Sequence, residues 1–165
     1  MFEGYRLRAL FNRLRASGMV LATAESLTGG MIGAFITNIP GASDVYWGGI
    51  VSYRNDAKSG VLGVASALID EYGVVSQQCA EAMACGVLKL SGADISVAVT
   101  GVAGPGGGTK DTPVGIVWIT TARVKSGQKP DLTSKCLSLI GSRAYIRSAT
   151  VRASVSLLIA HLDRK

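Results

Sequence analysis

The chain has 165 residues, of which 48% are hydrophobic and 17% are charged, and its formal net charge is +6. This length and composition exclude a disordered protein and fit one domain with its own hydrophobic core. No apolar run approaches the roughly 20 residues of a membrane span, and the arginine-containing N-terminus lacks the apolar stretch of a secretory signal. We therefore expect a single soluble, cytoplasmic domain over residues 1–165.

Hydrophobic periodicity predicts strands that alternate with helices along the chain. In the first half we expect a helix over 3–17, a buried strand over 19–23, a helix over 31–39, a strand over 48–53 and a helix beginning near Asn55 as its N-cap. In the second half we expect a helix over 76–92 capped by Ser76, a strand over 94–100, a glycine loop over 101–112, strands over 113–122 and 132–140 joined by a turn at 127–130, and a closing helix over 142–162. Strands separated by helices and followed by a hairpin predict an α/β fold, a three-layer α/β/α single domain with a mixed sheet.

The positive charge is spread along the chain rather than gathered in one block. Only 6% of the residues are aromatic, so the chain is poorly supplied with the stacking side chains that bind single-stranded nucleic acid. We expect neither a nucleic acid nor a membrane partner, and favour a small anionic ligand or a merely solvated basic face. The cysteines, Cys79, Cys85 and Cys136, lack CxxC spacing and are typical of free thiols in a reducing cytosol.

The first candidate site is TAESLTGG, residues 23–30, in which Ser26 follows a predicted strand and precedes two glycines. A strand–turn–helix joint exposes backbone N–H groups that can bind an anion or an oxyanion. Ser26 is therefore a candidate nucleophile. Taken alone, however, the octapeptide favours a serine that only caps the helix.

Further candidate residues follow the ends of other predicted strands. Tyr53 ends the strand over 48–53, Lys58 lies about one helical turn later, and Thr100 ends the strand over 94–100. Ligands of α/β sheets gather beyond the carboxyl edge, where these side chains should meet Ser26. A lysine in a poorly solvated site can act as a general base, because only the neutral amine accepts a proton. The alternative for Lys58 is an ordinary surface lysine.

Several other chemistries are not expected. His161 is the only histidine and lies on the terminal helix, so a Ser-His-Asp triad is not expected and Lys58 is the available base for Ser26. One histidine, scattered cysteines and no paired carboxylates give no recognisable metal site, and GVAGPG is neither a Walker A nor a dinucleotide fingerprint. Arg143 and Arg147, one turn apart at a helix start, are unfavourable to the helix dipole, so they are anion-binding candidates or part of a solvated face.

Together, the segments TAESLTGG, PGAS, GGIVSYRNDAK, GVVS, DISVAVTGVAGPGGG, PVGIVWI and GSRAYIR resemble the CinA C-terminal domain family, from about Val20 to Leu158. The family includes stand-alone nicotinamide-nucleotide amidases (NMN deamidases), which hydrolyse the carboxamide of nicotinamide mononucleotide to the acid and ammonia in pyridine-nucleotide salvage. The resemblance implies a nucleophilic Ser26 and a lysine partner, Lys58, with Tyr53 beside it. It also implies that Thr100 and the arginines complete the site, with no cofactor and no metal.

On this resemblance we expect Ser26 to attack the carboxamide, and Lys58 to take its proton and later help ammonia to leave. We expect the backbone around Thr28, Gly29 and Gly30 to bind the oxyanion, and Tyr53 and Thr100 to orient the Ser–Lys pair. We expect the 5′-phosphate to be bound by Arg143, by Arg147 or by the glycine loop that contains Gly101 and Gly104.

Two positions depart from the family pattern. Leu27 stands where cysteine is usual, which suggests packing, and Ser142 stands where aspartate is usual, which could alter how Arg143 is held.

The large N-terminal domain of full-length CinA proteins is not in this sequence, so we do not expect its activity. We expect a homodimer. The alternatives are a non-catalytic module that binds a nucleotide or a protein, and an amidase for another small amide.

Overall fold

The computed structural model describes residues 2–124 and 128–164. Within them, five strands form one sheet: β1 (Leu21–Glu25), β2 (Tyr46–Val51), β3 (Ile95–Gly101), β4 (Ile116–Arg123) and β5 (Asp131–Ser138). Their order across the sheet is β2-β1-β3-β4-β5. β1 is parallel to β2 and β3, whereas β4 is antiparallel to both of its neighbours. The sheet is therefore mixed, as predicted.

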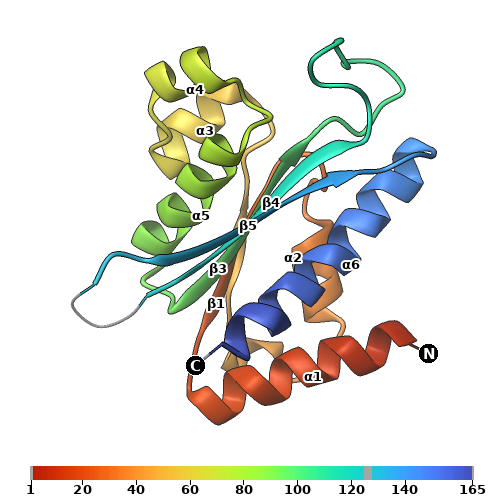
Figure 1. The fold of residues 1–165 in the computed structure, drawn as a ribbon. Coiled ribbons are helices and arrows are strands. Elements are labelled where there is room, and N and C mark those ends of the chain that lie inside the picture. The colour runs from red at the N-terminus through yellow and green to blue at the C-terminus, as the bar shows by residue number, and fades with distance from the viewer. Residues whose placement is uncertain (1, 125–127, 165) are drawn as a thin grey trace.

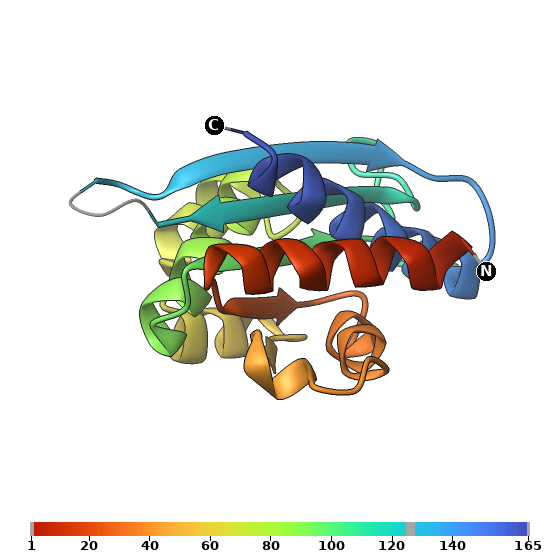
Figure 2. The same cartoon turned by 90° about the horizontal axis from the view of Figure 1, so that it is seen from below.

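Helices cover both faces of this sheet (Figure 1). On one face lie α1 (Phe2–Ser17), α2 (Met31–Thr37) and α6 (Arg143–Leu162), and on the other lie α3 (Asn55–Leu62), α4 (Ser66–Tyr72) and α5 (Gln77–Ser91). A short 3-10 helix, Ala42–Asp44, precedes β2. Figure 2 shows α1 lying along the strands on the same face as α6. The three-layer α/β/α architecture is confirmed.

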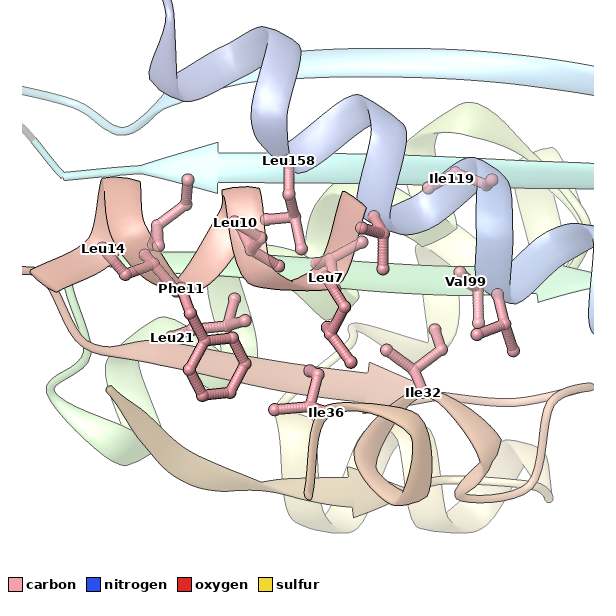
Figure 3. Close-up of a cluster of buried hydrophobic side chains, with 14 of the residues drawn as sticks. Leu7, Leu10, Phe11, Leu14, Leu21, Ile32, Ile36, Val99, Ile119 and Leu158 are labelled. Atoms are coloured by element: carbon pink, nitrogen blue, oxygen red, sulfur yellow. The ribbon is translucent and has the colours of Figure 1, made fainter. Parts of the chain in front are cut away.

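The larger core fills the space between the sheet and the first group of helices. Leu7, Leu10, Phe11 and Leu14 have the helical spacing seen in the sequence, and all four are buried in this cluster (Figure 3). A second core lies under α5, where the facing strands carry small side chains, among them Ala22, Ala24 and Ala98. The predicted periodicity therefore identified the buried face of α1 correctly.

The strand bounds differ from the predicted ones, and the displacements of β1 and β2 affect the site. β1 lies two residues later than predicted, so it includes Glu25 and ends directly before Ser26. β2 ends at Val51, which leaves Tyr53 in the loop that follows. The predicted turn at 127–130 lies partly outside the described residues.

Helix caps agree with the predictions only in part. Ser76 caps α5 as predicted, because its hydroxyl accepts a hydrogen bond from the Cys79 amide at 3.1 Å. The prediction that Asn55 is an N-cap was wrong, since Arg54 is the extended residue before α3 and its side chain makes no capping hydrogen bond.

The short helix α4 was not predicted. No helix in the described part of the chain is both long and apolar enough to cross a membrane.

Candidate active site

Ser26 lies in a turn at the carboxyl end of β1. Its amide donates to the Val99 carbonyl of β3 at 3.1 Å, which fixes the start of the turn against the neighbouring strand. Ser26 does not cap α2, because that helix begins at Met31 and its N-cap, Gly30, makes no side-chain capping bond. The interpretation of Ser26 as a capping serine was therefore wrong.

The carboxylate of Glu25 binds the start of α2 instead. It is only 2% exposed and accepts hydrogen bonds from the amides of Gly30, Ile32 and Gly33 at 3.0, 3.0 and 2.9 Å. Glu25 was not predicted to have this role, because it ends β1 and the first turn of α2 contains no acidic residue that would signal a cap.

This arrangement changes which amides can bind an oxyanion. The Gly30 amide donates to Glu25, and the Gly29 amide donates to the Ser26 carbonyl at 3.0 Å. The expectation that Gly29 and Gly30 supply oxyanion donors therefore needs correction, because both N–H groups are already used. The amides of Leu27 and Thr28 have no hydrogen-bond acceptor among the described residues.

Lys58 is buried directly behind Ser26. Its Nζ lies 3.1 Å from Ser26 Oγ and 2.7 Å from the Ser52 carbonyl oxygen, and the residue is 0% exposed. Burial lowers the pKa of Lys58, and the nearby Cys79 opposes that shift. A neutral amine can donate to the Ser52 carbonyl and still offer its lone pair to the Ser26 hydroxyl. The structure therefore places a hydroxyl beside an amine that loses its proton more readily than an exposed lysine does.

An open cavity of about 270 Å³ lies against Ser26. Its walls include Ser26, Tyr53, Thr100, Gly101, Gly104 and Arg143, so most of the predicted site residues meet in one place. Gly104 has a φ of +75°, and a Cβ there would lie 2.6 Å from Val114 Cγ1, which explains the glycine at this bend. The prediction that the ends of different strands converge on one crevice is confirmed for these residues.

The hydroxyls of Tyr53 and Thr100 make contacts different from those expected. Tyr53 is 55% exposed and its hydroxyl accepts a hydrogen bond from Arg143 at 2.8 Å. Thr100 donates to the Val74 carbonyl at 2.7 Å and so fixes the loop before α5. Neither hydroxyl makes a hydrogen bond to Ser26 or Lys58. The group that orients Lys58 is the Ser52 carbonyl, which the sequence did not single out.

The two candidate arginines have different positions. Arg143 lies at the cavity, where it donates to the Gly104 carbonyl at 2.9 Å as well as to Tyr53. Arg147 donates to the carbonyls of Leu27 and Thr28 at 3.0 and 2.7 Å and does not line the cavity. This geometry therefore does not support Arg147 as a direct phosphate ligand.

The remaining sequence candidates lie outside this centre. His161 is buried, with its Nδ1 2.7 Å from Thr121 Oγ1 and its Nε2 3.4 Å from Asp131, so it is not the partner of Ser26. Leu27 is 3% exposed and belongs to the larger core, as its predicted packing role requires. Within the described residues, no three His, Cys, Asp or Glu side chains are grouped so that they could hold a metal ion.

Comparisons with known proteins agree with this architecture. The family model for the CinA C-terminal domain matches residues 6–162. CinA-like proteins of Thermotoga neapolitana and Mycobacterium avium are 50% and 43% identical over 92% and 94% of this chain, which spans 36% of the length of each.

Two solved structures are also closely similar. The competence/damage inducible protein CihA from Agrobacterium tumefaciens is 39% identical with a TM-score of 0.90, and the match covers 98% of this chain and 95% of that one. The CinA superfamily protein KP700603 from Klebsiella pneumoniae is 31% identical with a TM-score of 0.89, and 97% of each chain is covered.

Proposed function

Because the chain belongs to the CinA C-terminal domain family, we propose that it is an amidohydrolase that converts nicotinamide mononucleotide to nicotinate mononucleotide and ammonia. One observation carries the proposal: the Nζ of a fully buried lysine lies 3.1 Å from the hydroxyl of a serine at the wall of an open cavity. A buried amine is a stronger candidate base than an exposed lysine, because burial disfavours its ammonium form.

The proposed reaction needs only these groups and water. Lys58 takes the hydroxyl proton while Ser26 Oγ attacks the carboxamide carbon, and the free amide of Leu27, a residue that lines the cavity, binds the resulting oxyanion. When the C–N bond breaks, the Lys58 ammonium returns the proton to the leaving nitrogen and ammonia departs. Water then attacks the Ser26 ester, Lys58 accepts its proton, and the acid is released as the serine recovers its hydrogen.

The position of Arg143 is an argument for a substrate that carries a phosphate. Its guanidinium donates to two neutral oxygens, those of Gly104 and Tyr53, and within the described residues it has no carboxylate partner. Its positive charge at the cavity therefore remains available for an anion. A nucleotide with its carboxamide at Ser26 and its 5′-phosphate near Arg143 uses both features.

The test is release of ammonia from nicotinamide mononucleotide by the purified protein. We expect Ser26→Ala and Lys58→Ala each to abolish turnover, and the double variant to be no worse than either, because residues that act as one unit are not additive. Ser66→Ala and Lys89→Ala, which remove the same groups from exposed helical positions, should retain the activity. Saturable nucleotide binding without ammonia release by the wild-type protein would instead identify a binding module.

A further inference from the structure

Glu25 is a buried carboxylate that joins the strand before the proposed nucleophile to the helix after it. The residue is 2% exposed and does not line the cavity against Ser26. Its Oε2 accepts hydrogen bonds from the amides of Gly30 and Ile32 at 3.0 Å each, and its Oε1 accepts one from the amide of Gly33 at 2.9 Å. The side chain therefore reaches past the whole turn that begins at Ser26 and binds the first residues of α2.

The end of the turn that Glu25 holds consists of two glycines. Gly29 and Gly30 have φ values of +60° and +94°, a region that favours glycine. Gly30 is also the N-cap of α2, and it has no side chain with which to cap the helix. The helix has only seven residues, too few to be stable by itself. The carboxylate of Glu25 thus supplies the acceptors and the negative charge that the start of α2 otherwise lacks.

The backbone of Glu25 fixes the other end of the turn. The Glu25 carbonyl accepts a hydrogen bond from the Ser52 amide at 2.9 Å, and the next amide, that of Ser26, donates to Val99 at 3.1 Å. The Ser52 carbonyl in turn accepts from Lys58 Nζ at 2.7 Å, and Nζ lies 3.1 Å from Ser26 Oγ. A closed circuit of contacts therefore runs from Glu25 through Ser52 and Lys58 to Ser26, which is bonded covalently to Glu25.

The direction of the Ser26 side chain depends on both peptides that flank its Cα. The sheet fixes the peptide before Ser26, because strands on either side bind it. The peptide after Ser26 is held within the turn, where the Ser26 carbonyl accepts from the Gly29 amide at 3.0 Å. Glu25 binds the adjacent amide, that of Gly30. The position of the hydroxyl relative to Lys58 therefore depends on a turn that the Glu25 carboxylate closes.

We propose that Glu25 is a positioning residue: its carboxylate fixes the turn after Ser26 and so keeps the hydroxyl within reach of Lys58. This inference rests on the proposed function, since it concerns the nucleophile of that reaction. Glu25 touches neither the substrate nor the base, and it acts through the backbone of the turn.

The kinetic test compares Glu25→Gln with Glu81→Gln, a matched control on α5. Glu81 is also a hydrogen-bonded carboxylate, with Gln77 and Ser134 as donors at 2.8 Å each, and it does not line the cavity. Glutamine at position 25 offers one acceptor oxygen, and its amide group would face a backbone donor. A displacement of about 1 Å can cost on the order of 100-fold in rate.

We expect Glu25→Gln to lower kcat by about 10- to 100-fold. KM should stay the same, because Glu25 is not part of the cavity wall. Glu81→Gln should keep both parameters. Glu25→Gln with reduced stability in urea but wild-type kcat would overturn the inference and leave the carboxylate as a helix cap only.

Glu25→Asp provides a second variant in case Glu25→Gln does not fold. Aspartate keeps the carboxylate, but its shorter side chain cannot reach all three amides, so kcat should lie between those of the wild type and Glu25→Gln, again with KM unchanged. Circular dichroism identifies the folded proteins. A folded Glu25→Asp with wild-type kcat would contradict the positioning role. If neither variant folds, the carboxylate serves the fold as a whole and the positioning role is wrong.

The pH profile separates positioning from an effect of charge. If Glu25 acted on Lys58 through its negative charge, its removal would lower the pKa of Lys58 and move the rise of kcat/KM to lower pH. Positioning leaves the midpoint of that rise in place and lowers the rate at every pH. A shifted midpoint with a wild-type plateau would therefore overturn the inference.

A substrate-independent probe separates failure of this inference from failure of the proposed function. A fluorophosphonate reacts with a nucleophilic serine: Ser26 Oγ bonds to phosphorus, fluoride leaves and Lys58 accepts the hydroxyl proton. Wild-type protein that is labelled at Ser26 but releases no ammonia from the mononucleotide would contradict the substrate, while the labelling rate still tests Glu25.

The labelling rates of the two glutamine variants decide the inference. Labelling of Glu25→Gln that is slower than that of Glu81→Gln, by about the factor lost in kcat, supports it. Equal rates refute it and leave the Ser26–Lys58 pair intact. A wild-type protein that is not labelled at Ser26 would contradict both the proposed nucleophile and the positioning role.

Discussion

At the scale of single residues, the burial of Lys58 links the proposed catalysis to the stability of the fold. Burial lowers the pKa of Lys58 from its ordinary value of 10.5. We therefore expect kcat/KM to rise with pH as Lys58 loses its proton, with a midpoint below 10.5. A Lys58→Arg variant keeps a charge that does not dissociate in this range, so it should be inactive at every pH. A pH profile with no ascending limb would contradict Lys58 as the base.

The lowered pKa of Lys58 also predicts how stability changes with pH. Between the folded pKa of Lys58 and 10.5 the unfolded chain binds more protons, so the free energy of unfolding rises with pH in that window. The penalty for burying the ammonium is complete below the folded pKa and disappears above 10.5. It amounts to about 1.4 kcal/mol for each tenfold difference in proton affinity between the folded and unfolded chains. Urea unfolding of wild type and Lys58→Met at several pH values measures it, and a constant difference between the two proteins would show that Lys58 titrates like an exposed lysine.

Arg143 gives a further prediction at this scale. A charge-assisted contact to phosphate is worth about 1.5–3 kcal/mol, or roughly 10- to 150-fold. Arg143→Ala should therefore lower kcat/KM by that amount on the nucleotide and far less on the nucleoside. Tyr53→Phe removes one contact of Arg143 and should produce a smaller loss with the same preference. Equal losses on both substrates would make Arg143 structural.

At the scale of elements, α6 carries both candidate arginines, Arg143 and Arg147, near its first residue. Ser142 caps this helix by accepting a hydrogen bond from the Tyr145 amide at 3.2 Å, and Arg143 is its first residue. Aspartate, usual at this position in the family, can accept the same bond and also favours the helix dipole. The departure at residue 142 is thus an exchange between two capping residues, and it leaves the helix start intact.

This account of Ser142 is testable by stability measurements. Ser142→Ala should lower the free energy of unfolding by about 1 kcal/mol, a typical cost for losing a cap, whereas Ser142→Asp should match or exceed the wild type. Chemical unfolding of the three proteins gives the comparison, with Ser148→Ala as the control on the same helix. If alanine and serine are equally stable, the hydroxyl contributes nothing as a cap.

The elements also show what sequence reasoning can reach. Periodicity and strand ends identified α1, β3 and the residues that gather at the cavity, because these depend on local patterns and on the shared edge of a parallel sheet. Lys58 was correctly predicted to lie at Ser26, but the backbone and long-range partners of these residues were missed. Lys58 is oriented by the backbone of Ser52, and the Leu27 carbonyl is held by Arg147 from 120 residues away. Backbone acceptors and distant donors leave no periodic signature in the sequence.

At the scale of the whole molecule, the parallel strands bring the candidate site together. Leu21 pairs with Ile95 and Glu25 with Val99, so β1 is hydrogen-bonded to β3. In the sequence, β2 and several helices lie between these two strands. The Ser26 amide continues that pairing to Val99, and Lys58 reaches Ser26 only after β2 has joined β1. The hairpin β4–β5 adds antiparallel strands beyond β3 and contributes neither member of the pair.

This topology sets the order in which activity can appear during folding. Helices form from local contacts within microseconds, whereas parallel pairing must first close long loops and is slow. On dilution from denaturant, helical ellipticity should return before Ser26 becomes reactive toward a fluorophosphonate. Simultaneous recovery of both signals would contradict this order. For a chain emerging from the ribosome, the proposed nucleophile and base are synthesised before β3 and stay unassembled until β3 has followed them, which keeps Ser26 unreactive on any chain that still lacks β3.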